Sequence, residues 1–81
     1  MKKSLVKMKP GETGTITEIE GGIGVRHHLD SLGIRINKKV EKVSQVLMKG
    51  PVTIKVDNSK IAIGRGMASK IYVNADSKEA Q

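Results

Sequence analysis

The chain has 81 residues and no cysteine, so it holds one domain and excludes disulfides, thiolate metal sites and thiol catalysis. Its 15 Lys and Arg against 8 Asp and Glu give a net charge of +7, which favours either an acidic partner or a lysine-rich solvated surface. With Tyr72 as the one aromatic residue, proline-rich peptide grooves and base stacking are nearly excluded, since both need several rings.

No segment of the sequence has the character of a membrane span or a signal peptide. The longest purely apolar runs, such as Ile61-Ala62-Ile63, are far shorter than the roughly 20 residues that cross a bilayer. The charged start, Met1-Lys2-Lys3, is not followed by an apolar signal core. We therefore expect a cytoplasmic protein.

The N-terminal part of the chain predicts a turn followed by a strand. Residues 9–12, Lys-Pro-Gly-Glu, are typical of a turn because Pro presets φ and Gly accepts positive φ. Residues 13–20 are strand-like. The three-residue spacing of Ile16 and Ile19 breaks strict alternation and indicates a β-bulge.

One segment, at residues 25–34, has the pattern of an α-helix. Val25, Leu29 and Leu32 fall at i, i+4 and i+7 and define one apolar face. Gly33 then acts as a helix stop, because glycine takes positive φ without a Cβ penalty.

The second half of the chain predicts further strands at residues 38–46, 52–56, 61–63 and 71–73. Valines three residues apart in the first of these indicate a second bulge, and Asn37 before it tolerates the left-handed region. Residues 57–60 make a tight hairpin turn, and residues 64–69 a single 3₁₀-like turn.

These short strands, bulges and turns predict a mainly β fold. About five strands favour a small, partly open SH3-like barrel, because closing a sheet removes its exposed edges. One short α-helix is inserted after the first strand. We expect the barrel domain to span residues 1–74 and residues 75–81 to form a polar, disordered tail.

The predicted helix carries both histidines, which makes it the candidate metal site for a divalent transition metal, Fe or Zn. His27 and Asp30 lie at i and i+3 and share a face, whereas the adjacent His28 points about 100° away from His27. These residues supply two or three of the ligands that a stable site needs, so a partner or a second copy would complete it. The alternative is an ordinary surface ion pair, and no nucleophile completes a catalytic set.

A second candidate surface is the loop before Pro51. Leu47 and Met48 stand where a hairpin loop is normally polar, so they either form a contact surface or fold back onto the core. Nucleic-acid binding through Lys and Arg is a third possibility, and it predicts an affinity that falls steeply with salt.

Four segments, in order and spacing, resemble the FeoA family of small accessory proteins in bacterial ferrous-iron transport. They read MKPGETGTI at residues 8–16, LDSLGI at 29–34, GPV at 50–52 and IAIGRGMASKIYV at 61–73. The family pattern has Arg where His28 stands and tends to have Gly where Asn37 stands.

The resemblance implies a cytosolic binding module, rather than an enzyme, that acts beside the membrane GTPase-permease FeoB. We expect it to contact the cytosolic part of a FeoB-type transporter through Leu47, Met48, Arg26 and Arg65. It would then sit at the inner face of the membrane through this partner, without a small-molecule substrate and with at most weak homo-oligomerisation. The alternative function is a transition-metal-binding or metal-sensing module that uses His27, His28 and Asp30.

Overall fold

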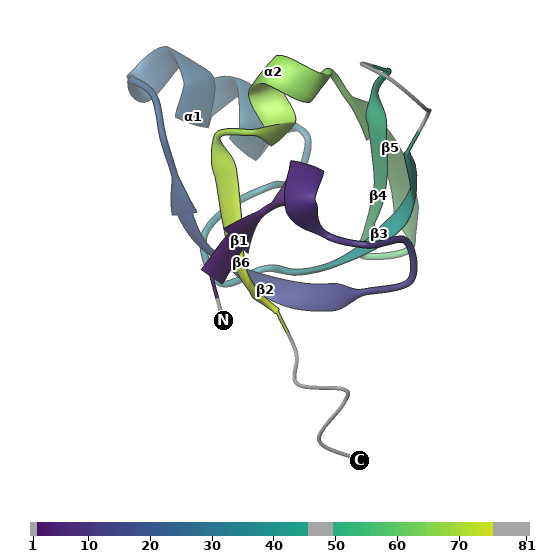
Figure 1. Cartoon of the computed structure of the whole chain (residues 1–81). Helices are drawn as coiled ribbons and strands as arrows, with labels where there is room; N and C mark the ends of the chain where they lie inside the picture. Colours follow the sequence, from purple (N-terminus) through teal and green to yellow (C-terminus); the bar gives the residue numbers. More distant parts are fainter. Residues whose placement is uncertain (1, 46–49, 76–81) are drawn as a thin grey trace.

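The computed structural model describes residues 2–45 and 50–75 (Figure 1). The elements follow in the order β1 (Lys2–Ser4), 3₁₀-helix η1 (Leu5–Lys7), β2 (Thr13–Ile19), α1 (Ile23–Ser31), β3 (Lys39–Gln45), β4 (Val52–Val56), β5 (Ser59–Ile63), α2 (Arg65–Ala68) and β6 (Ile71–Ala75). Leu47 and Met48 lie outside the described residues. No helix within residues 2–45 and 50–75 is long and apolar enough to cross a membrane.

The strands of the described chain form one antiparallel sheet in the order β1-β6-β2-β3-β4-β5. The sheet curls around its core, and α1 and α2 lie at the same end of it (Figure 1). The expected mainly β, SH3-like architecture is confirmed. β6 continues to Ala75, one residue past the domain boundary that we expected.

The sheet has six strands rather than about five, because β1 is an additional strand. It pairs with β6 in the register Lys3↔Val73. Its residues are Lys, Lys and Ser, so no apolar alternation marked it in the sequence. This strand forms because β6 offers it an edge with which to pair. Since β1 is the first strand, α1 follows the second strand of the chain, whereas we expected it after the first.

Both predicted β-bulges are confirmed. The β2–β6 register shifts between Ile16 and Glu18, and the β3–β4 register shifts between Lys42 and Ser44. The predicted hairpin turn is also confirmed, since β4 and β5 are joined by two residues with positive φ, Asp57 and Asn58.

α1 is confirmed as a helix, and it ends in a Schellman motif. The N–H of Gly33 donates to the carbonyl of Asp30 at 2.9 Å, and the N–H of Ile34 donates to the carbonyl of Leu29 at 2.9 Å. Gly33 has a φ of 86°, as the motif requires. The predicted stop at Gly33 therefore holds.

The prediction that Leu32 lies on the buried face of the helix is wrong. Leu32 caps the helix and is 39% exposed, whereas Leu29 is fully buried. The helical period ends before Leu32, and the chain reverses at the following glycine. Ile34, after the reversal, fills the buried place beside Leu29.

The segment expected to be a 3₁₀-like turn is a short α-helix, α2. The N–H of Ala68 donates to the carbonyl of Gly64 at 2.9 Å, and that of Ser69 to the carbonyl of Arg65 at 3.0 Å. These bonds have the i→i−4 spacing of an α-helix. Ala68 is fully buried, so packing of α2 onto the core sustains a helix this short.

Candidate site on helix α1

A hollow of about 180 Å³ lies beside α1 and is here called the α1 pocket. Its lining residues come from the end of β2, from α1 and from the segment after α1: Ile19, Arg26, His27, Asp30, Ile34, Arg35 and Ile36. Ile34 is fully buried, and Ile19 and Ile36 pack against the core. The pocket thus combines an apolar floor of three isoleucines with polar and charged side chains.

The α1 pocket carries more positively than negatively charged side chains. Arg35 Nε lies 2.8 Å from Asp30 Oδ1, and these two side chains are 56% and 61% exposed. Arg26 stands four residues before Asp30, on the same side of α1. Two guanidinium groups therefore face one carboxylate, which leaves an excess of positive charge at the pocket even with His27 neutral.

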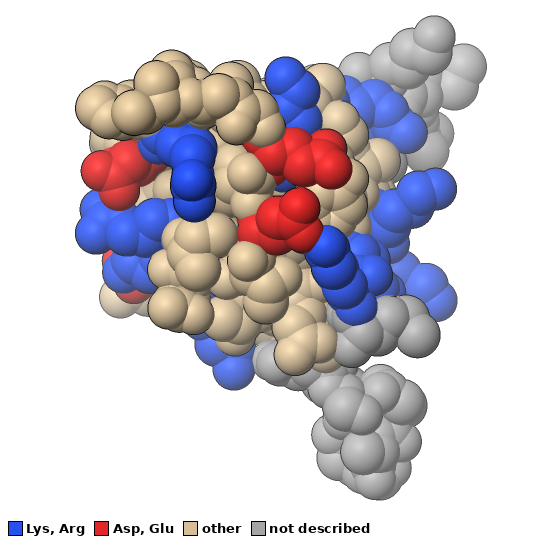
Figure 2. Space-filling model, turned by 90° about the vertical axis from the view of Figure 1, so that its left-hand side faces the viewer, with Lys and Arg blue, Asp and Glu red and all other residues tan. Residues whose placement is uncertain are grey.

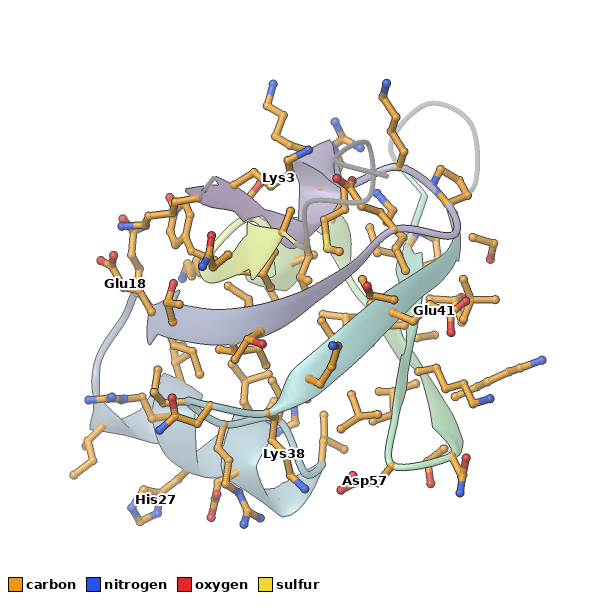
Figure 3. The ribbon with its side chains drawn as sticks, turned by 90° about the horizontal axis from the view of Figure 1, so that it is seen from below. Lys3, Glu18, His27, Lys38, Glu41 and Asp57 are labelled. Carbon is orange, nitrogen blue, oxygen red and sulfur yellow. The ribbon has the colours of Figure 1, made fainter. Side chains whose placement is uncertain are left out.

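The structure brings together two of the three predicted metal ligands. His27 and Asp30 both line the α1 pocket, and His28 does not. Figure 3 shows His27 on the outer side of α1, directed away from the sheet. Within the described ranges, no three His, Asp or Glu side chains gather where they could hold a metal ion.

These residues fit a metal poorly as they stand. A structural zinc site needs about four ligands, and here one of two candidates, Asp30, already pairs with Arg35. The histidine and carboxylate ligand set stays a prediction that a partner would have to complete.

The two predicted partner contacts that the structure describes, Arg26 and Arg65, lie on different helices. Arg26 lines the α1 pocket, whereas Arg65 is half-buried at the start of α2 and does not line it. Leu47 and Met48, outside the described residues, stay a prediction.

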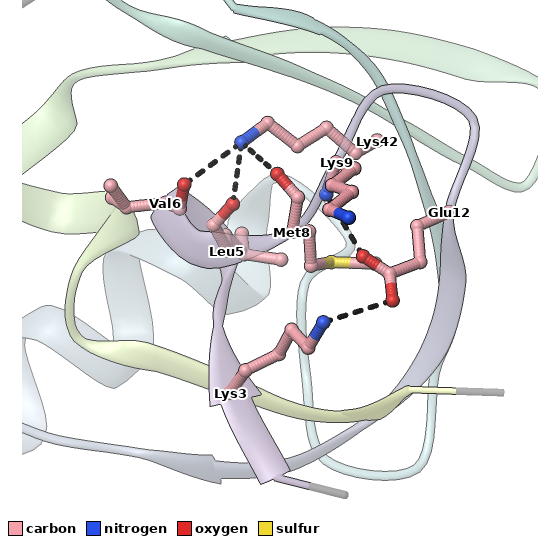
Figure 4. A network of polar contacts seen from close by, with 7 residues as sticks. All are labelled: Lys3, Leu5, Val6, Met8, Lys9, Glu12 and Lys42. Atoms are coloured by element: carbon pink, nitrogen blue, oxygen red, sulfur yellow. Dashed lines mark hydrogen bonds and ion pairs between the residues drawn. The ribbon is translucent and has the colours of Figure 1, made fainter. Parts of the chain in front are cut away.

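Lys42 is a buried charged residue that sequence reasoning missed. Its side chain is fully buried, and its Nζ donates to the carbonyls of Leu5 at 2.9 Å, Val6 at 3.1 Å and Met8 at 2.7 Å (Figure 4). An ammonium group has three donors, so these three carbonyls satisfy it. Lys42 thereby fastens η1 and the residue after it to β3.

The environment of Lys42 opposes its positive charge. Burial lowers the pKa of Lys42, and the charge of Arg65 lowers this pKa further, while Glu12 raises it. A signal in the sequence could have found this residue, because Lys42 falls two positions after Val40 and so shares its inward parity on β3.

Glu12 joins the turn before β2 to strand β1. Its Oε1 accepts the N–H of Lys9 at 2.9 Å, and its Oε2 lies 3.0 Å from Lys3 Nζ (Figure 4). The hydrogen bond from Lys9 and that from Lys3 lower the pKa of Glu12, against a smaller opposing effect of burial. This carboxylate is structural, since both of its oxygens are engaged within the domain.

On the face that Figure 2 presents, the surface charge is spread rather than gathered. Figure 2 shows basic and acidic side chains interspersed over the face that it presents. Several lysines pair with carboxylates, namely Lys2 with Glu18, Lys3 with Glu12 and Lys38 with Asp57. Such interspersed charge does not favour a polyanion as the partner.

Comparisons with known proteins agree on one family. A family model of the FeoA domain matches residues 3–75. The Methanocaldococcus jannaschii protein named "Putative Fe(2+) transport protein A" is 42% identical over 65 residues, which cover 80% of this chain and 77% of that protein.

Solved structures extend this similarity to the fold. A crystal structure of the iron uptake regulatory protein FeoA superposes with a TM-score of 0.86 at 30% identity, covering 94% of this chain and 99% of that chain. A manganese-dependent transcriptional repressor shares the fold, with a TM-score of 0.84 at 20% identity over 93% of this chain and 42% of that chain. The chain is a member of the FeoA family, which is involved in Fe(2+) transport.

Proposed function

We propose that this protein is a cytoplasmic accessory protein of ferrous iron uptake that binds the cytosolic part of a FeoB-type GTPase-permease. The observation that carries the proposal is its 42% identity to a protein named for Fe(2+) transport. The net charge of +7 adds a long-range attraction to acidic protein surfaces. In this role the protein reaches the inner face of the membrane through its partner.

The α1 pocket supports a binding module rather than an enzyme. Its volume of about 180 Å³ is smaller than the roughly 300–1,000 Å³ typical of small-molecule sites. It offers one imidazole and one carboxylate, and the carboxylate is paired with Arg35. General acid–base chemistry needs a group free to exchange a proton with a bound substrate.

Calorimetry with the purified cytosolic domain of the transporter tests the adaptor role. Wild-type protein is expected to bind it, and the double variant Leu47→Asp/Met48→Asp is expected to bind at least about tenfold more weakly, because it places two carboxylates in an apolar contact, where desolvating them is costly. Lys60→Glu, an exposed change on β5, is the control. No binding by the wild type overturns the adaptor role, while unchanged binding by the double variant removes only this loop from the interface.

Metal binding is the second candidate function, and the placement of His27 and Asp30 in one pocket favours it. Titration with Zn²⁺ or Fe²⁺, followed through the NMR signals of the histidine rings, decides it. Shifts of the His27 ring at stoichiometric metal support it. Unmoved ring signals exclude these histidines as ligands.

A further inference from the structure

The α1 pocket is the right size for one side chain of another protein. Its volume of about 180 Å³ is too small for a typical metabolite site, but it accommodates a single aliphatic side chain. The half-buried Ile19 and Ile36 offer such a side chain an apolar surface. An apolar anchor that enters a small pocket is a common way in which a protein segment is held.

The charges of the pocket select a carboxylate over a cation. Arg26 and Arg35 outnumber Asp30, so an approaching metal ion meets net repulsion and an approaching carboxylate meets net attraction. Guanidinium groups also bind carboxylates through two parallel hydrogen bonds, which adds geometric specificity. Asp30 occupies Arg35 in the free protein, and so acts as an internal competitor for this position.

The apolar lining of the pocket favours an acidic peptide over a phosphate ligand. A phosphodiester or a free phosphate would leave the apolar surface of Ile19 and Ile36 unused. A peptide that carries a carboxylate next to an aliphatic side chain uses both parts of the pocket. The long-range attraction from a net charge of +7 brings acidic segments to this surface.

We propose that the α1 pocket recognises an acidic–aliphatic peptide segment of the transporter's cytosolic part. A carboxylate of this segment binds Arg26 and Arg35, displacing Asp30 from Arg35, and a neighbouring aliphatic side chain lies on the isoleucine floor. This inference rests on the adaptor role and names the chemistry by which it operates.

Charge variants of the pocket test the inference on the transporter's cytosolic domain. Arg26→Glu is expected to raise the Kd at least about tenfold, because it turns attraction into repulsion at a recognition contact. Asp30→Asn is expected to lower the Kd about twofold to fivefold, because it removes the competitor for Arg35. Lys60→Glu changes the net charge as much as Arg26→Glu does, and its Kd is expected to stay within about twofold of wild type.

The sign of the Asp30→Asn effect separates this inference from metal recognition. A metal-dependent contact would lose a ligand in Asp30→Asn and bind more weakly, whereas carboxylate recognition binds more tightly. If the domain binds wild type but Arg26→Glu matches Lys60→Glu, the pocket inference fails and the adaptor role survives.

A peptide probe tests the recognition chemistry of the pocket independently of the transporter domain. The tripeptide acetyl-Ile-Glu-Ile-amide is titrated into ¹⁵N-labelled protein, with acetyl-Ile-Gln-Ile-amide and sodium acetate as controls. Amide shifts at Ile19, Arg26 and residues 34–36 with the Glu peptide, and none with the Gln peptide, support it. Equal shifts with both peptides, or shifts with acetate alone, overturn it.

Discussion

Lys42 shows how one residue can hold a segment that has no strong structure of its own. β1 and η1 are elements of three residues each, and the ammonium group of Lys42 donates to the carbonyls of Leu5 and Val6 in η1 and of Met8 after it. The cost of burying this charge is offset by three charge-assisted hydrogen bonds. Within the described chain, no buried side-chain nitrogen or oxygen lacks a hydrogen-bond partner.

We expect Lys42→Met to lower the free energy of unfolding by about 1–3 kcal/mol, because it removes the ammonium donor shared by three carbonyls. Urea unfolding followed by circular dichroism measures this. Lys55→Met, an exposed lysine on β4, is expected to stay within about 0.5 kcal/mol of wild type. Equal stability of Lys42→Met and wild type would show that water replaces the ammonium group.

Glu12 should make the stability depend on pH in the acid range. Its pKa in the folded protein is below its ordinary value of 4.5, so between these two values the unfolded chain binds the proton more readily. The stabilisation is therefore present above pH 4.5 and is lost as the pH falls through the folded pKa.

Glu12→Gln should lower the free energy of unfolding by about 1 kcal/mol at pH 7, and this difference should shrink as the solution is acidified. Urea unfolding at a series of pH values checks it. Lys3→Met removes one of the two groups bound to Glu12. The difference in the free energy of unfolding between wild type and Lys3→Met should therefore also shrink on acidification, to a smaller extent. A difference that is constant from pH 7 to pH 3 would contradict the linkage.

At the scale of the element, the end of α1 depends on one glycine. Gly33 has a φ of 86°, and a Cβ added there would meet no atom within 4 Å, so the cost of a side chain is backbone strain alone. Gly33→Ala is expected to lower the free energy of unfolding by about 1–2 kcal/mol. For a domain of this size, this corresponds to a fall in Tm of roughly 4–16 °C.

Gly24→Ala is a matched control with the opposite sign. Gly24 lies inside α1 and has no positive φ, and a Cβ added there would also meet no atom within 4 Å. Alanine there is expected to raise stability by up to about 1 kcal/mol through helix propensity. If both variants lower Tm equally, the strain at Gly33 is not the cause.

At the scale of the whole molecule, Leu29 joins α1 to the barrel. Leu29 is fully buried and Leu32 is 39% exposed, although both fit the same helical face in the sequence. Leu29→Ala is expected to cost about 2–4 kcal/mol, whereas Leu32→Ala should cost less than about 1 kcal/mol. The first cost is large against the roughly 4–12 kcal/mol expected for a domain of 81 residues.

Thermal unfolding of Leu29→Ala and Leu32→Ala distinguishes these roles. One cooperative transition, shifted far more by Leu29→Ala, is the expected result. Separate melting of α1 in Leu29→Ala would show that the helix and the barrel are not one cooperative unit.

Features set by neighbouring residues could be predicted from the sequence. The bulge near Ile16, the hairpin turn at Asp57 and Asn58 and the stop at Gly33 depend on spacing and on φ preferences that lie within a few residues. The FeoA family followed from the order of four motifs. Strand β1, which is set by pairing with β6, was missed. The burial of Lys42 was also missed, although its shared parity with Val40 indicates an inward position.

The residues of the candidate site also divide into those that the sequence could indicate and those that only the fold brings together. His27, Asp30 and Arg26 could be selected from the sequence because they are close together on one helix. Ile19 and Arg35 could not be added, since only the packing of α1 against the end of β2 and the reversal at Gly33 bring them to the same pocket.

The sequence by itself determined the mainly β class, the helix with its glycine stop, the bulges and the family. These follow from local periodicity and backbone preference, which a single stretch of chain carries. The tertiary structure decided that β1 is a strand, that Ile34 rather than Leu32 is buried, and that Arg35 joins Arg26 beside His27 and Asp30. Each of these depends on a free energy shared between distant segments, so no local pattern records it. That is why α1, which the sequence marks as a candidate metal site, is also proposed here as a site for a carboxylate.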